Sequence, residues 1–474
     1  MRRIITFLAL LLSFSIDTMA QDIQRYAGDW QGVLNVGVSL RIVFHVKENN
    51  GTFSSSGDSP DQSAYGLKCD TTIVTANGIR IEMRSLNATF EGKLINDSTI
   101  DGKFTQGQTF PLQLKRSHVA IVPVELIRPQ TPKPPFPYKS EDVEYDNADR
   151  SLHYGATITI PEGKGPFPAA VLITGSGPQD RDEALMGHKP FAVIADALTK
   201  NGFIVLRVDD RGVGKSTGKF NDATSADFAK DVSTSFDYLL SRTEVNKKKV
   251  GLIGHSEGGM IAPMVASQRK DVNFVVLLAA PGIRIDQLMA EQSAAVLRSV
   301  GIPRAAADSY IPLYRQMMDI ISTAPDTLTA VLDASAAMQA WVNNTDSSLV
   351  KQMGFVSEQI KRDVVNSLVE GFSGKWFRYF LSFDPQQYLQ KMNTKVLALN
   401  GEKDIQVIPS SNLAGIEQAL KKSKSKYTVK LMPGLNHLFQ KCTTCSIQEY
   451  EQIEETVSPE ALKEINDWLN KTVK

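Results

Sequence analysis

The sequence predicts two domains, an all-β unit followed by a larger α/β domain with a mostly parallel sheet. Three observations predict this division. Residues 26–116 alternate apolar and polar side chains with a period of two, as half-buried antiparallel strands do. Five prolines between Pro129 and Pro137 then indicate a stiff linker. Beyond residue 138, short apolar runs alternate with helical stretches, which is typical of a parallel sheet covered on both faces.

The first residues, MRRIITFLALLLSFSIDTMAQD, are typical of a secretory signal peptide. Arg2 and Arg3 precede an apolar run that is shorter than the ~20 residues a membrane-spanning helix needs. We therefore expect residues 1–20 to be removed by cleavage after Ala20. The mature chain should be periplasmic or secreted and have no stable membrane anchor.

The composition excludes several classes of partner. The chain has 474 residues, and 52 Lys and Arg balance 52 Asp and Glu, so no charge excess favours nucleic acid. The histidines are scattered singly and do not form pairs at zinc-ligand spacing, so we expect neither a metal nor another cofactor. Cys442 and Cys445 form a C-T-T-C segment that an exported chain could oxidise to a disulfide, and Cys69 is left over.

The N-terminal domain is predicted to comprise residues 21–118. Segments such as LRIVFHVK, ATFEGKLI and DGKFTQ alternate in polarity, and Asn77-Gly78 is a strong signal for a hairpin turn. Strands of this kind indicate a small barrel or sandwich. The Pro-rich linker is predicted for residues 119–138.

The second domain is predicted to comprise residues 139–474. EDVEYDN and LHYGATITIP are expected to pair as a hairpin, and the buried runs AAVLIT, FIVLRVDD, VGLIGHS, NFVVLLAA, KVLALN and YTVKLM follow as sheet strands. Residues of about 284–391 interrupt this series with helical sequence only. We interpret that interruption as a helical cap inserted into the sheet domain, with an unrelated helical domain as the alternative.

A serine, an aspartate and a histidine each lie just after a predicted strand. Ser256 lies in GHSEG, the G-x-S-x-G pattern of a nucleophile elbow, where Gly254 and Gly258 leave room for a sharp turn. Asp404 follows KVLALN, and His437 follows YTVKLM. Ligands bind at the carboxyl ends of strands in open parallel sheets. The order serine, acid, histidine is that of the α/β-hydrolase fold.

These residue types suit acyl transfer. A serine hydroxyl needs a base to remove its proton, and a neutral histidine, here His437, is the expected base. Asp404 would fix the histidine tautomer and stabilise the imidazolium. The backbone N–H groups of Glu257 and Ser176 are the expected oxyanion-hole donors.

Several segments together resemble a known family. LITGSGPQDRDE, GHKPF, VDDRGVGKSTG, GLIGHSEGG and LNHLFQ are similar to exported bacterial α/β-hydrolases, which include esterases and peptidases of the prolyl-oligopeptidase or proline-iminopeptidase type. The resemblance covers about residues 141–468 and implies the same fold and a serine-hydrolase activity. Members often carry a β-rich N-terminal domain, and the segments around Trp30 and GDSPDQ look similar to it.

The triad acid has a second candidate, and the roles of two further histidines are open. Glu402 lies nearer the strand end than Asp404, but the family pattern favours Asp404 as the triad acid. His188 precedes the nucleophile in the chain, so it is interpreted as lining the pocket or as structural. His255, the variable residue of the elbow, is expected to pack or to shape the pocket.

Two other motifs do not support nucleotide binding. DRGVGKS ends like a phosphate-binding loop, but Asp209 stands where that loop requires its first glycine. TGSGPQD offers G-x-G, but Asp180 occupies the position of the third glycine of a dinucleotide fingerprint.

The substrate pocket is expected between the elbow and the cap. Gly175 and His188 are its candidate residues from the sheet domain. In the cap segment GKWFRYFLSF, helical spacing puts Trp376, Tyr379 and Phe380 on one face together with Phe383. That face either forms the core of the cap or roofs an acyl pocket.

The sequence therefore predicts a serine hydrolase that cleaves a carboxylic ester through an acyl-enzyme. The first alternative is an aminopeptidase or dipeptidyl-type peptidase on the same triad, and the second is a hydrolase-like binding protein with a degenerate site. The expected partner is a small ester or a short peptide, whose acyl and alcohol groups the sequence leaves open.

Overall fold

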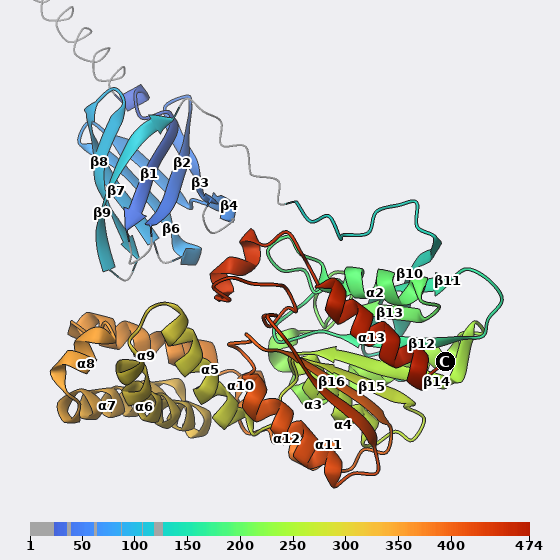
Figure 1. Ribbon diagram of the computed structural model, residues 1–474. Coiled ribbons are helices and arrows are strands. Elements are labelled where there is room, and N and C mark those ends of the chain that lie inside the picture. The colour runs from blue at the N-terminus through green and yellow to red at the C-terminus, as the bar shows by residue number, and fades with distance from the viewer. Residues whose placement is uncertain (1–22, 36–38, 61–63, 87, 107, 118–126) are drawn as a thin grey trace, which may run out of the picture. The chain divides into compact units, whose positions relative to one another are not determined.

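The chain divides into two compact units, Met1–Glu125 and Leu126–Lys474. The computed structural model describes residues 23–35, 39–60, 64–86, 88–106, 108–117 and 127–474 (Figure 1). The predicted signal peptide and the first part of the predicted linker, residues 119–126, lie outside the described residues. No described helix combines the length and the apolar character that crossing a membrane requires.

The N-terminal unit contains one antiparallel sheet of nine strands in the order β4-β3-β2-β1-β9-β8-β7-β6-β5. Its strands are β1 (Gly28–Asn35), β2 (Ser39–Asn49), β3 (Thr52–Ser59), β4 (Ala64–Lys68), β5 (Thr71–Thr75), β6 (Gly78–Met83), β7 (Ala88–Asn96), β8 (Thr99–Gln106) and β9 (Gln108–Ser117). The hairpin predicted at Asn77-Gly78 joins β5 to β6.

This sheet curls around its own core (Figure 1). Trp30, Phe44 and Phe90 are fully buried inside it, which explains the period-two alternation of the sequence. The Ser55 hydroxyl on β3 lies 2.7 Å from that of Thr72 on β5, so the two ends of the sheet approach each other. The sequence left a barrel and a sandwich open. The described strands form one curled sheet and not the two stacked sheets of a sandwich.

The described part of the Pro-rich segment is anchored to the second unit. Arg128 donates hydrogen bonds to the carbonyls of Met186, Glu451 and Ile453 at 2.7–3.0 Å. The first strand of the second unit begins at Tyr138, the last residue of the predicted linker. Residues 128–137 therefore belong structurally to the second unit.

The second unit is built on an eight-stranded sheet in the order β10-β11-β13-β12-β14-β15-β16-β17. Its strands are β10 (Tyr138–Asp146), β11 (His153–Pro161), β12 (Phe167–Ile173), β13 (Ile204–Val208), β14 (Val245–His255), β15 (Phe274–Leu278), β16 (Lys395–Gly401) and β17 (Lys426–Met432). β10 and β11 pair antiparallel, as the hairpin prediction requires, and the strands from β13 through β17 are parallel.

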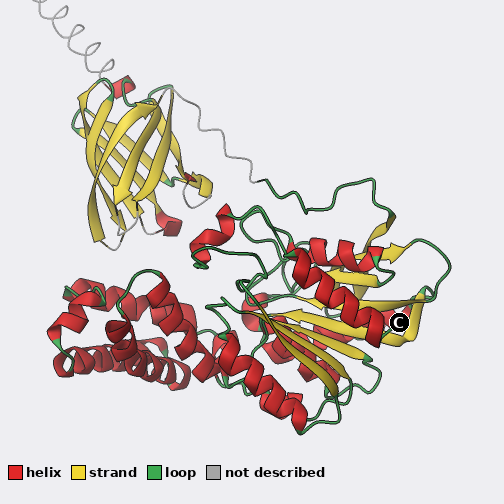
Figure 2. Cartoon of the chain, in the orientation of Figure 1, coloured by secondary structure: helices red, strands yellow, loops and turns green. Residues whose placement is uncertain are grey.

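Helices cover both faces of this sheet (Figures 1 and 2). One buried cluster joins the sheet to α2 (Pro190–Lys200) and α13 (Pro459–Thr472). The other joins it to α3 (Ser225–Ser241), α4 (Glu257–Ala266) and α12 (Pro409–Lys421). Burial on both faces is why these strands have continuous apolar runs instead of alternation.

The predicted cap is a helical insertion between β15 and β16. Its helices are α5 (Ile285–Ser299), α6 (Arg304–Thr323), α7 (Thr327–Asn344), α8 (Ser347–Gln352), α9 (Glu358–Phe372), α10 (Lys375–Leu381) and α11 (Gln386–Leu389). The N–H of Ile285 donates to the carbonyl of Phe383 at 3.1 Å, so the two ends of the insertion meet. Figure 1 shows α6 to α9 as a bundle that α5 and α10 join to the sheet.

Candidate active site

Ser256 occupies a strained turn between β14 and α4. Its backbone has φ +51° and ψ −117°, a conformation that residues with a Cβ rarely adopt. A Cβ on Gly254 would overlap the backbone of Gly258, and one on Gly258 would overlap the carbonyl of Ile173. The glycines on both sides of Ser256 are therefore required by close backbone contact, as expected for a nucleophile elbow.

His437 and Asp404 meet from two loops that follow neighbouring strands. The distance from His437 Nδ1 to Asp404 Oδ2 is 2.8 Å. The other oxygen of Asp404 accepts the N–H groups of Gln406 and Val407 at 2.8 and 2.9 Å. The exposed fractions of the Asp404 and His437 side chains are 0% and 6%. This geometry allows His437 Nδ1–H to donate to a carboxylate that its own loop holds in place.

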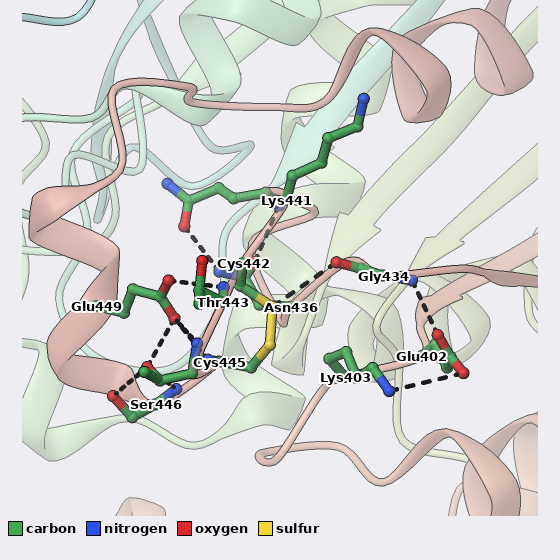
Figure 3. The surroundings of a disulfide bond; sticks show 12 residues. Glu402, Lys403, Gly434, Asn436, Lys441, Cys442, Thr443, Cys445, Ser446 and Glu449 are labelled. Carbon is green, nitrogen blue, oxygen red and sulfur yellow. Dashed lines mark hydrogen bonds and ion pairs between the residues drawn. A yellow bond between two sulfur atoms is a disulfide. The ribbon is translucent and has the colours of Figure 1, made fainter.

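The rival acid, Glu402, faces another way. Its side chain is 42% exposed and lies 3.8 Å from Lys403 Nζ. Its carboxylate also accepts the N–H of Gly434 at 3.0 Å, as Figure 3 shows. Glu402 therefore supports the turn before the histidine loop, while Asp404 contacts the imidazole.

Ser256 and His437 line the same cavity, which has a volume of about 380 Å³. The described hydrogen bonds include none between the Ser256 hydroxyl and His437. Gly175 and Ser176 form another part of the cavity wall. We call the segment of Gly175 and Ser176 the oxyanion loop. The structure thus brings the proposed nucleophile, the proposed base and this loop to one cavity.

The two expected oxyanion donors lie at this cavity. Helix α4 begins at Glu257, so the N–H of Glu257 has no acceptor within the helix, and the positive end of the helix dipole is beside Ser256. Ser176 belongs to the loop after β12, and the N–H of the preceding Gly175 donates to Glu183 Oε1 at 2.6 Å. Both segments can present a backbone donor to a developing oxyanion.

The side chain of Glu257 connects the elbow to the cap. Its Oε1 accepts hydrogen bonds from Ser225 Oγ at 2.6 Å and Trp376 Nε1 at 2.9 Å. Burial raises the pKa of Glu257 above its ordinary value, while hydrogen bonds from Ser225, Trp376 and Ser176 favour its carboxylate. The sequence pattern assigned only the backbone of Glu257, whereas the structure shows that its carboxyl group orients Trp376.

The aromatic residues of α10 divide into two groups, which corrects the prediction of one shared face. Trp376 stacks on Phe380 with a distance of 5.0 Å between the ring centroids. Both residues line the cavity together with Phe372 and Phe377. Tyr379 does not line the cavity and instead packs against Phe383, with 6.2 Å between the two ring centroids. The helix ends at Leu381, so the helical spacing assumed for Phe383 does not extend that far.

His188 lies outside the cavity, so of the two roles predicted for it the structure supports the structural one and corrects the pocket-lining one. It is 0% exposed. Its ring nitrogens lie 2.9 Å from the Thr456 hydroxyl and 2.9 Å from the Tyr450 carbonyl. Burial lowers the pKa of His188 from 6.5 to about 4, so the ring is neutral in the folded protein at neutral pH.

The pKa of His188 predicts a loss of stability in acid. Between pH 6.5 and 4 the unfolded chain binds a proton at this position before the folded chain does, so unfolding becomes more favourable as the pH falls. His188→Gln removes this difference. Urea unfolding, followed by tryptophan fluorescence, should show that the parent loses about 2 to 3 kcal/mol more of its free energy of unfolding than the variant between pH 7 and 4.5. Equal losses in both proteins would show that His188 is not buried in its neutral form.

Cys442 and Cys445 form a disulfide shortly after the histidine loop (Figure 3). The Glu449 carboxylate accepts the N–H groups of Thr443 at 2.7 Å and Thr444 at 2.8 Å, and thereby closes the same turn. Cys69 is a free thiol in the N-terminal unit.

The histidine loop also depends on Asn436, which the sequence reading missed. Asn436 is fully buried, and its Oδ1 accepts the N–H groups of Leu438 at 3.0 Å and Gln440 at 2.9 Å. The available signal was the dipeptide Asn-His, since an asparagine side chain commonly binds the backbone two residues further on. Asn436 holds the backbone on both sides of His437.

Comparison with known proteins gives partial matches to other hydrolases. Esterase EstD of Thermotoga maritima is 27% identical over 285 residues, which are 59% of this chain and 57% of that protein. Acyl-coenzyme A thioesterase 3 of Mus musculus is 30% identical over 125 residues, 26% of this chain and 25% of that protein. The chain therefore spans less than two thirds of the length of either relative.

A solved esterase of Pyrococcus furiosus matches with a TM-score of 0.42 and 15% identity, covering 71% of this chain and 92% of that chain. The family described as serine aminopeptidase, S33, matches residues 188–441, which is more than half of the 474 residues. That range includes the elbow serine and the loops of Asp404 and His437. The chain belongs to the serine aminopeptidase S33 family of α/β-hydrolases.

Proposed function

We propose that this hydrolase cleaves a carboxylic ester through a Ser256–His437–Asp404 triad and an acyl-enzyme intermediate. The observation that carries the proposal is the position of His437, which contacts Asp404 at 2.8 Å and shares a cavity with the strained Ser256. The similarity to EstD, named an esterase, adds support for the ester as substrate.

In the proposed reaction, Ser256 Oγ attacks the ester carbonyl while His437 Nε2 takes the hydroxyl proton. Asp404 keeps the other proton of His437 on Nδ1 and stabilises the imidazolium. The N–H groups of Glu257 and Ser176 bind the oxyanion. His437 then protonates the leaving alcohol, and a water molecule activated by the same histidine hydrolyses the acyl-enzyme.

The cavity suits an apolar acyl group. Its wall combines the aromatic side chains of Phe372, Trp376, Phe377 and Phe380 with aliphatic ones from α5. Apolar walls with a few convergent polar groups are typical of small-molecule sites. They also exclude water from the reacting centre.

A peptidase on the same triad is the second candidate, favoured by the family description and by two carboxyl groups at the cavity, Glu183 and Glu257. A substrate ammonium group needs a carboxylate that is not already paired. Glu183 Oε1 lies 3.0 Å from His255 Nδ1, and Glu257 accepts hydrogen bonds from Ser225 and Trp376. These contacts favour the ester. The other oxygen of Glu183, Oε2, has no hydrogen-bond partner among the described residues and is the feature that supports the peptidase.

The test is a panel of p-nitrophenyl esters against aminoacyl-nitroanilides, together with labelling by a fluorophosphonate. We expect labelling at Ser256 and a kcat/KM for the best ester well above that for any anilide. A preference for an aminoacyl-anilide would favour the peptidase, and absence of labelling would favour a degenerate binding protein.

The aromatic wall predicts a change of acyl preference in Phe380→Leu. Shortening this side chain lengthens the cavity, so the ratio of kcat/KM for octanoyl to butanoyl esters should rise by about 3- to 10-fold. Tyr379→Leu is the matched control, because Tyr379 lies on the same helix but outside the cavity. Parallel acyl profiles in parent, Phe380→Leu and Tyr379→Leu would place the acyl group elsewhere.

The proposal includes export after cleavage near Ala20. It is supported by the basic and apolar N-terminal sequence and by the disulfide, which is typical of oxidising compartments. Sequencing the N-terminus of the protein recovered from the periplasm or medium should give Gln21 as its first residue.

A further inference from the structure

A second buried carboxylate–imidazole pair lies beside the proposed triad. Glu183 Oε1 and His255 Nδ1 are 3.0 Å apart. Their side chains are only 7% and 9% exposed. The proposed reaction uses neither side chain, and burying such a pair is costly unless its contacts compensate.

The contacts of His255 determine its protonation state. Its Nδ1 faces a carboxylate oxygen, and its Nε2 lies 3.1 Å from the carbonyl oxygen of His437. With Glu183 as a carboxylate, both partners only accept hydrogen bonds, and each ring nitrogen then carries a proton. Burial opposes this charge, but the Glu183 carboxylate outweighs it and holds the pKa of His255 above its ordinary value of 6.5. The contacts of the two ring nitrogens and the raised pKa both favour an imidazolium paired with the Glu183 carboxylate.

The pair joins three segments that the proposed reaction must align. Glu183 Oε1 also accepts the N–H of Gly175 at 2.6 Å, directly before the oxyanion donor Ser176. His255 itself directly precedes Ser256 in the elbow. Its Nε2–H holds the backbone of His437, and the two imidazole rings are 4.9 Å apart.

We infer that Glu183 and His255 are positioning residues that hold the oxyanion loop and the backbone of His437 in register with Ser256. This inference rests on the proposed triad. The physical reason is that donors and base act on the transition state only when they are held within a fraction of an ångström, and each lies on its own loop. A buried ion pair supplies short, directional contacts to all three segments at once.

Two conservative variants test the pair. Glu183→Gln keeps an oxygen acceptor and the side-chain shape but removes the charge that keeps His255 doubly protonated. His255→Gln keeps two N–H donors but places both on one nitrogen, whereas the imidazole donates from two separate ring nitrogens to Glu183 and to the His437 carbonyl. His153→Gln is the control, since His153 also lies between two carboxylates, Glu144 and Asp146, but outside the cavity.

The measurements are kcat and KM for a p-nitrophenyl ester and the Ki of a trifluoromethyl ketone, which forms an oxyanion adduct with an activated serine. We expect each variant to lower kcat by about 10- to 100-fold, the loss that a misplacement of about 1 Å causes, with KM nearly unchanged. Ki should rise by a similar factor. The double variant should lose no more than the stronger single variant, because both break one connection. His153→Gln should behave as the parent.

A merely structural role would give a different result. It would lower the melting temperature while the folded variants kept the kcat and Ki of the parent, and that result would overturn the inference. If His255→Gln fails to fold, Glu183→Gln alone decides. A parent that neither hydrolyses esters nor reacts with a fluorophosphonate would overturn the proposed function together with the inference. An active, labelled parent with unaffected variants would overturn only the positioning role.

Discussion

Replacing Ser256 by alanine is expected to lower kcat for ester hydrolysis by about 10⁴- to 10⁶-fold, the range found when a triad nucleophile is removed. The variant loses the only group of the elbow that can form an acyl-enzyme. Its folding should be unaffected, because alanine keeps the Cβ and therefore the same strain at φ +51°. The measurement is kcat at saturating p-nitrophenyl ester together with the thermal unfolding curve.

Ser267→Ala is the matched control for this prediction. Ser267 follows the other end of helix α4, and its hydroxyl donates only to the Met264 carbonyl at 3.0 Å. Its replacement should leave kcat within a factor of about two, because Ser267 lies at the opposite end of α4 from Ser256. Substitutions at such positions rarely change the free energy of unfolding by more than a few tenths of a kcal/mol. If Ser256→Ala kept substantial activity with the unfolding curve of the parent, the nucleophile would have to be another residue.

Asp404→Asn is expected to lower kcat by about 10⁴-fold, as in other triads whose acid becomes an amide. The amide oxygen can still accept the N–H groups of Gln406 and Val407, so the loop should remain folded. The amide nitrogen would then face His437 Nδ1 and donate to it. This moves the imidazole proton to Nε2, where it prevents proton transfer from Ser256.

Glu402→Gln tests whether Glu402 or Asp404 is the acid of the proposed triad. The Glu402 side chain is 42% exposed and its contacts are with Lys403 and Gly434, so this change should alter kcat by less than about threefold. The comparison uses the same ester and the same pH for both variants. A loss of activity in Glu402→Gln as large as that in Asp404→Asn would transfer the acid role to Glu402.

Much of the fold follows from the sequence because its signals are local. A period of two predicts a half-buried strand, and a continuous apolar run between helices predicts a strand buried on both faces. The elbow was predictable because its G-x-S-x-G pattern is local, and Gly254 contacts the backbone of Gly258 within the same turn. The second contact, of Gly258 with the carbonyl of Ile173 on β12, is visible only in the tertiary structure. The strand ends then placed Asp404 and His437 at one edge of the sheet.

The sequence by itself thus determined that an all-β unit precedes an α/β unit, where the helical insertion lies and which residues follow each strand, while it left open whether the β unit is a barrel or a sandwich. Only the tertiary structure decided which side chains meet. Glu183 and His255 are 72 positions apart, and His255 and His437 are 182 apart, so no local pattern relates them. Likewise, packing decides that Phe380 lines the cavity while Tyr379, its neighbour on α10, packs against Phe383. Contacts with distant loop residues bury His188. Side-chain direction depends on packing between segments, which periodicity along the chain does not encode.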